Sequence, residues 1–182
     1  MKLYIIRIFF YLIIYMHKDN RPTFFTEDGQ PIRAAGILCY VYHKSFDENK
    51  KNKKIWLFRN QNSYYSDTGG KTDAIDKTVL DTAIRETVEE TNGRLFSSKH
   101  DYDICKKILI REFDRQKPEP IYVKNCKYLL YPLRLRYKNK FLSLKRFGEK
   151  ETHDDMEHSY HWCENIPKNL HPRLKSIKDN LK

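Results

Sequence analysis

Residues 69–93 read GGKTDAIDKTVLDTAIRETVEETNG, and this stretch decides the fold of the chain. A glycine pair is followed by a helical segment in which Glu86, Glu89 and Glu90 recur at spacings of three and four residues. Residues at those spacings share one face of a helix. Three neighbouring carboxylates repel one another, so the pattern predicts a compensating cation. Mg²⁺ is the natural candidate, since it is bound by carboxylates where phosphates supply further ligands.

The stretch resembles the Nudix box, the sequence pattern of the Nudix hydrolases. Gly70 matches the first glycine of the box. Arg85-Glu86 and Glu89-Glu90 match its core, which is Arg-Glu, an apolar residue, any residue and Glu-Glu. The internal spacing of that core is the one the family has. The stretch therefore resembles a MutT-type box, with departures.

The departures from the box lie on either side of the core. Asp76 stands where the box has its first glutamate, with one extra residue between it and Arg85. The extra residue is expected in the loop before the helix, and Asp76 is expected to cap the first turn rather than bind metal. Thr87 occupies an apolar position, and Asn92 occupies the late glycine position. Asn is the next most tolerant residue of a left-handed backbone, so we expect the helix to end there.

The resemblance implies an α/β class and a Nudix-type α/β/α sandwich with a mixed β-sheet. It also implies hydrolysis of a nucleoside diphosphate linked to another group, with Mg²⁺ or Mn²⁺ as cofactor. By position in the box, Glu86 and Glu90 are the expected metal ligands, with the Gly69 carbonyl as a further one. Glu89 is the expected general base, or another ligand, and Arg85 is expected to hold a box carboxylate by a bidentate ion pair.

The remaining sequence predicts the elements around the box. Apolar, β-branched and aromatic runs predict strands at 33–43, 54–58, 128–135 and 160–163. Residues 60–67 are expected to form a polar turn, 77–91 the box helix, 104–113 a strand or a short helix, and 166–181 a basic terminal helix. Pro132 lies inside one of the strands and predicts an edge or a bulge there.

The charge of the chain bears on its partners. The 182 residues suffice for one domain, and their net charge is +11, from 35 basic and 24 acidic residues. This charge is typical of proteins that bind nucleotides, RNA, inositol polyphosphates or anionic membranes, or of a solvated lysine-rich surface. The expected partner is a phosphorylated small molecule or capped RNA. A decapping or inositol-pyrophosphate hydrolase, and a non-catalytic binding module of the same fold, remain alternatives.

Other motifs argue for a reducing, cytoplasmic setting and against a second nucleotide motif. The four cysteines have no CxxC spacing, and disulfides are not expected: Cys39, Cys105, Cys126 and Cys163. Gly70-Lys71-Thr72 resembles the end of a P-loop, but Tyr65 stands where that motif needs glycine.

The N-terminal segment 1–16 is set apart from the domain expected at 17–182. Its apolar run LYIIRIFFYLIIYM at 3–16 is shorter than the ~20 residues that cross a bilayer. It is read as a strand, as a surface anchor, or as residues ahead of a true start at Met16. Membrane association is otherwise not expected.

Further candidates lie outside the box. An acidic stretch could supply a base or form a solvated loop: Glu149, Glu151, Asp154, Asp155 and Glu157. Tyr64 and Tyr65 could stack on a base or pack the loop before the glycines. His153, His158 and His161 lie close in sequence, but a metal pair is not favoured beside a predicted strand.

Overall fold

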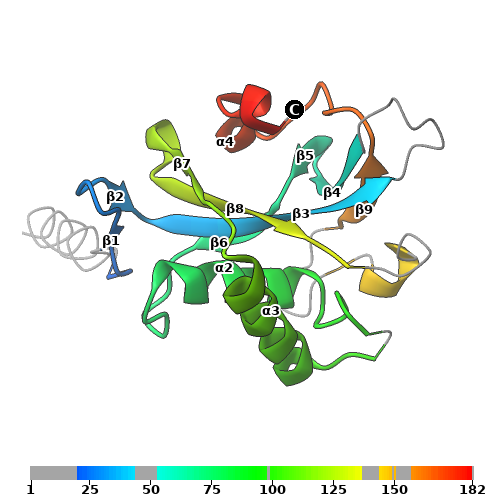
Figure 1. Cartoon of the computed structure of the whole chain (residues 1–182), viewed down its shortest axis with the longest axis horizontal. Coiled ribbons are helices and arrows are strands. Elements are labelled where there is room, and N and C mark those ends of the chain that lie inside the picture. The colour runs from blue at the N-terminus through cyan, green and yellow to red at the C-terminus, as the bar shows by residue number, and fades with distance from the viewer. Residues whose placement is uncertain are drawn as a thin grey trace, which may run out of the picture.

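A mixed sheet forms the centre of the molecule, with helices on both faces. The computed structural model describes residues 20–43, 53–97, 99–136, 144–148, 150 and 157–181. Helices α2 (Val79–Glu90) and α3 (Tyr102–Gln116) lie on one face of the sheet, and α4 (Pro172–Lys175) lies on the other (Figure 1). This is the α/β/α sandwich that the sequence predicts.

The sheet has seven strands, in the order β5-β4-β3-β8-β7, with β6 also paired to β3 and β9 to β4. Their bounds are β3 Ala34–His43, β4 Lys53–Gln61, β5 Tyr64–Ser66, β6 Thr68–Lys71, β7 Ile121–Val123, β8 Tyr128–Arg134 and β9 Ser159–Cys163. Only the β3–β8 pair is parallel among these described pairings. A separate two-stranded sheet joins β1 (Phe24–Phe25) to β2 (Pro31–Ile32).

The glycines of β6 sit in the middle of this sheet. β6 is antiparallel to the first half of β3, and Gly69 lies directly opposite Gly36. A Cβ atom on either glycine would overlap the hydroxyl of Tyr128, which fills the space that the two missing side chains leave. Glycine is therefore required at both positions by close approach.

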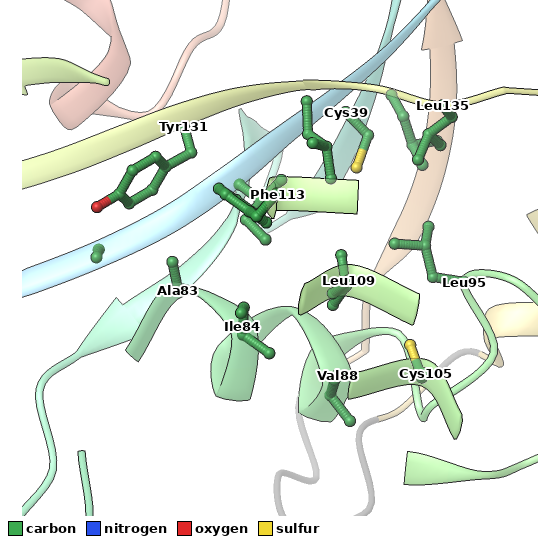
Figure 2. Packing of buried hydrophobic residues seen from close by; sticks show 14 of the residues in the cluster. Cys39, Ala83, Ile84, Val88, Leu95, Cys105, Leu109, Phe113, Tyr131 and Leu135 are labelled. Atoms are coloured by element: carbon green, nitrogen blue, oxygen red, sulfur yellow. The ribbon is translucent and has the colours of Figure 1, made fainter. Parts of the chain in front are cut away.

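Two apolar clusters, one on each face, hold the layers together. The larger one joins α2 and α3 to the sheet, and Figure 2 shows Ala83 and Ile84 of α2 near Leu109 and Phe113 of α3. The smaller one lies under the C-terminal segment and includes Leu174. Each cluster buries large apolar side chains away from water, and this burial is the main contribution to stability.

Segment 104–113, for which the sequence left strand and helix open, belongs to α3. Its buried residues Cys105, Leu109 and Phe113 recur every four residues, which is a helical period. Asp101 caps the helix, since its carboxylate accepts from the N–H of Ile104. Four-residue periodicity thus decides between the two alternatives.

Two expected irregular elements differ from the structure. Residues 60–67 are not only a turn: β4 continues to Gln61 and turns back into β5 through Asn62 and Ser63, both with positive φ. The prediction of one continuous terminal helix at 166–181 is wrong. Pro172, which lacks an N–H, begins the short α4, and a separate 3₁₀ turn follows at Lys178–Leu181.

Pro132 lies in β8, inside the sheet rather than at its outer edge. It pairs with Leu38 on the β3 side. On the other side, β7 pairs only as far as Leu130, so beyond that residue β8 has no described neighbour there. Pro132 therefore interrupts no hydrogen bonds between strands on that side. The predicted edge is confined to the part of β8 beyond Leu130.

The apolar segment 1–16 lies outside the described residues. Within the described part of the chain, no helix has the length and apolar character needed to cross a bilayer. All four cysteines are free, two of them buried and Cys126 exposed.

Candidate active site

Thr78, not Asp76, caps the box helix. The Thr78 hydroxyl accepts from the N–H of Asp81 at 3.1 Å, and the Asp81 carboxylate accepts from the N–H of Thr78 at 2.9 Å. This reciprocal pair is a capping box, and it starts α2 at Val79. The expectation that Asp76 caps the first turn is wrong because the chain turns into the helix two residues later.

Asp76 instead holds Arg85. The Arg85 Nε donates to Asp76 Oδ1 at 3.0 Å and its Nη2 donates to Oδ2 at 3.1 Å, which is a bidentate ion pair. The carboxylate also accepts from the Thr82 hydroxyl and from the N–H of Asp73. Burial acts to raise the pKa of Asp76, but these hydrogen bonds outweigh it and hold the pKa below its ordinary value.

Arg85 also binds the box glutamates. Its Nη1 donates to Glu86 at 2.8 Å and to Glu89 at 3.0 Å, and its Nη2 donates to the carbonyl of Lys71. One guanidinium thus joins three carboxylates of the box to the end of β6. Burial acts to lower the pKa of Arg85, but this surplus of carboxylates outweighs it and raises the pKa.

Glu86 and Glu90, one helical turn apart, both reach the glycine pair of β6. The N–H of Gly69 donates to Glu90 at 2.9 Å. The Glu86 carboxylate lies against Gly70, where an added Cβ would overlap it. The glycines therefore let the two expected metal ligands approach the strand backbone side by side.

Arg59 is a member of the site that the sequence analysis did not identify. It lies on β4, and its Nη1 is 3.1 Å from Glu90, with both side chains less than one-tenth exposed. The signal was present, because a single arginine follows the apolar run of β4, and as the last buried residue of that strand it needs a counter-ion. Its partner could not be predicted from the sequence, because Arg59 lies under α2 only through the register of the sheet.

The two arginines change the electrostatic reading of the box. Arg85 offsets part of the charge of Glu86 and Glu89, and Arg59 offsets that of Glu90, so part of the repulsion among the three acids is relieved by arginines. Among the described residues, no group of three or more His, Cys, Asp or Glu side chains is arranged to hold a metal ion. The donor set at the glycines is thus two carboxylates. This fits a cation that keeps several waters and takes phosphate oxygens, as Mg²⁺ does.

The other departures from the box are accommodated locally. Thr87 is fully buried at its apolar position, and its hydroxyl is 2.9 Å from that of Thr68, which donates to the carbonyl of Ile37. Asn92 has a φ of 51° and ends the helix as expected, with its side-chain amide donating to the carbonyls of Phe147 and Lys150.

A cavity of about 460 Å³ opens beside the box helix, between α2 and the start of α3. Glu89 and Arg85 line it from α2, and Tyr102 and Lys106 line it from α3. The Glu89 side chain is 37% exposed, against 8% for that of Glu90. The helix therefore presents Glu86 and Glu90 to the glycine strand and Glu89 to open space.

The structure separates the remaining candidates. Glu149, Glu151, His153, Asp154 and Asp155 lie outside the described residues. Glu157 and His161 are exposed, whereas His158 is buried against the ring of Tyr160, so His158 and His161 lie in different environments. Tyr64 is 46% exposed and lies edge-on to His171, and Tyr65 packs edge-on against Phe58 and His161.

A second buried ion pair lies across the sheet from the box. Asp67, which is fully buried, accepts from Arg173 Nε at 2.9 Å and from the Tyr128 hydroxyl. Arg173 also donates to Ser66 at 2.7 Å and stacks over the Tyr128 ring. The C-terminal segment is thereby fixed to the residue that precedes β6.

Comparison with known proteins returns similarity in structure only. No protein-family profile and no curated protein matches the chain. A solved C. elegans Ap4A hydrolase is 16% identical, over 72% of this chain and 79% of that one, with a TM-score of 0.35. The M. smegmatis Nudix hydrolase RenU is 10% identical, over 88% and 92%, with a TM-score of 0.37. Superpositions this loose carry no argument about the site. The box residues, gathered between α2 and β6, are the feature in which this chain resembles the Nudix hydrolases.

Proposed function

We propose that the chain is a metal-dependent pyrophosphohydrolase that cleaves a diphosphate linkage in a nucleoside diphosphate joined to another group. The observation that supports this proposal is the joint approach of Glu86 and Glu90 to Gly69 and Gly70, with Glu89 facing the adjoining cavity. A bound Mg²⁺ or Mn²⁺ would offset the charge of the diphosphate and lower the pKa of water.

Each box residue has a part in this proposal. Glu86 and Glu90 would hold the cation, with the Gly69 carbonyl as a further ligand. Glu89, exposed to the cavity, would accept the proton of the attacking water as general base. Arg85 holds the Glu86 and Glu89 carboxylates from one nitrogen and so keeps base and ligand at a fixed separation.

The test is the hydrolysis of a substrate panel by the purified chain with Mg²⁺ or Mn²⁺. The panel contains a nucleoside diphosphate sugar, a dinucleoside polyphosphate, an inositol pyrophosphate and a capped RNA. Glu89→Gln is expected to lower kcat by about 10²- to 10⁴-fold, the usual contribution of a general base. Glu86→Gln is expected to raise the metal concentration that gives half-maximal rate.

Glu119→Gln is the matched control, because Glu119 is an exposed glutamate in the turn after α3. It is expected to leave both quantities unchanged. Background product release on every substrate, equal for the wild type and the variants, would refute the hydrolase proposal.

One observation favours a second candidate, a non-catalytic module that binds diphosphates. The buried Arg59–Glu90 pair already engages one expected metal ligand at 3.1 Å. Such a module would bind a nucleoside diphosphate in calorimetry with equal affinity in the presence and absence of Mg²⁺, and would release no product.

A further inference from the structure

The sheet face that carries α4 continues past the cover of the C-terminal segment. That cover ends at Trp56, whose indole N–H donates to the carbonyl of Leu181 at 3.1 Å. Tyr40 lies opposite Trp56 and beside Arg134, and Tyr42 lies opposite Lys54. Side chains at paired positions share one face of a sheet. Tyr40, Tyr42, Lys54 and Arg134 therefore share the α4 face, and we call them the aromatic platform.

The rings of the aromatic platform are held in place by each other and by cations. The Tyr40 and Tyr42 centroids are 5.5 Å apart and the rings are nearly perpendicular. The Arg134 guanidinium lies 4.8 Å from the Tyr42 centroid, and the Lys54 ammonium lies 5.5 Å from the Tyr40 centroid. Tyr42 remains 38% exposed and Arg134 is exposed, so the platform presents an aromatic surface and positive charge to solvent.

The charge of the platform is not offset by its surroundings in the described chain. Neither Lys54 nor Arg134 forms an ion pair with a carboxylate among the residues that the structure describes. The acids of the box lie on the opposite face of the sheet, under α2. The platform therefore adds to the field of a chain whose net charge is +11, and that field attracts polyanions.

We propose that the aromatic platform binds single-stranded nucleic acid, with a base stacked on Tyr42 and backbone phosphates at Lys54 and Arg134. Every base has a π-face, so stacking on strand-borne aromatic rings accepts any sequence, and nearby cations follow the backbone. A duplex hides those faces, which makes the single strand the fitting ligand. The platform lies on the other side of the sheet from the box, so this proposal stands apart from the proposed hydrolase activity.

The test is fluorescence anisotropy of a labelled oligouridylate of about 16 nucleotides, titrated with the full chain over a range of salt concentrations. Tyr42→Leu is expected to weaken binding by roughly five-fold or more, while Tyr42→Phe, which keeps a ring, should bind as the wild type does. Lys54→Gln and Arg134→Gln should each lower the slope of log K against log salt by about 0.7.

Two matched controls lie away from the platform. Phe25→Leu removes a 65%-exposed ring on β1, and Lys107→Gln removes an exposed cation on α3. Both should bind as the wild type does. Thermal melts establish that each variant is folded, and the salt slopes of the two cation variants test the proposal independently of Tyr42.

Three outcomes would overturn the proposal. The first is a Tyr42→Leu variant that binds as tightly as Tyr42→Phe. The second is equal affinity for the single strand and for its duplex. The third is that the chain binds no oligonucleotide but binds vesicles of anionic lipid, and that the same variants lose this vesicle binding. That result would assign the platform to a membrane surface. Failure of substrate hydrolysis would leave all three measurements unaffected.

Discussion

Replacing Arg85 by glutamine tests whether the box is held together by charge. The substitution removes the bidentate partner of Asp76, whose side chain is only 2% exposed. Breaking a buried pair on one side costs about 3–5 kcal/mol, because it leaves an uncompensated charge. Asp76 keeps the Thr82 hydroxyl and the Asp73 N–H, and Arg85 is 16% exposed, so we expect the lower end, about 3 kcal/mol.

The measurement is unfolding by urea and by heat. A loss of about 3 kcal/mol corresponds to a fall in Tm of roughly 6–12 °C for a chain of this size. Asp76→Asn combined with Arg85→Gln leaves neither member of this pair charged, so the double variant should lose less than the two single variants together. The coupling is expected at about 0.5–3 kcal/mol.

The pH dependence of stability tests whether the Asp76–Arg85 ion pair stabilises the fold. The pKa of Asp76 is lowered in the folded chain relative to an unfolded value of about 3.9. Its contribution to stability is therefore complete above that unfolded value and is lost as the pH falls through the folded pKa. The stability difference between wild type and Arg85→Gln should narrow below about pH 4. An Arg85→Gln variant within 1 kcal/mol of the wild type at neutral pH would refute the reasoning, as would a difference that widens in acid.

Three further predictions concern buried groups. Arg173→Gln leaves the fully buried Asp67 without its ion-pair partner and should lower the free energy of unfolding by about 3–5 kcal/mol in urea titrations, whereas no measurable loss would contradict the pair. Cys126 is exposed and should react at once with a thiol reagent. Cys39 is buried and its thiol pKa is raised by burial, so reaction of Cys39 before unfolding would contradict the structure. Burial raises the pKa of Tyr131 to about 12, so this phenol should ionise later than the exposed tyrosines in an ultraviolet titration, and the Tyr131→Phe difference spectrum would identify it.

The parts of the fold that sequence predicts are those whose signals are local. The strand at 34–43 follows from composition, and the helix at 79–90 follows from helical spacing and from the glycines on either side of it. The helix at 102–116 is also local, since its buried residues repeat every four positions, and a count of that period would have resolved the ambiguity. The terminal helix fails because Pro172 interrupts the run of basic and apolar residues.

The partners of the box acids could not be predicted, because they depend on pairing between distant segments. Arg59 meets Glu90 only when β4 lies beside β3 in its observed register. Asp76 was assigned to the cap from its position alone, although the same loop also allows it to face Arg85, nine residues further along the chain. In both cases the residue type indicates a charged side chain, but only the folded structure shows which residue is its counter-ion.

The charge balance of the box bears on the choice between an enzyme and a binding module. Asp76, Glu86, Glu89 and Glu90 contribute four negative charges, and Arg59 and Arg85 return two positive ones. The remaining charge of minus two is what one divalent cation neutralises. The arginines thus relieve part of the repulsion among the crowded acids, and the negative charge that remains would attract a divalent cation.

The Arg59→Gln variant tests this charge balance. It removes the cation nearest Glu90 and leaves that carboxylate with the Gly69 N–H. If Glu90 is a ligand, Mn²⁺ should bind the variant at least about ten-fold more tightly, because a positive charge within a few ångströms of the site no longer opposes it. Calorimetric titration of Mn²⁺ measures the change, with Arg134→Gln as a control on the far face of the sheet. Equal or weaker Mn²⁺ binding by folded Arg59→Gln would show that Glu90 serves only as the counter-ion of Arg59, and the hydrolase proposal would then lose one of its two ligands.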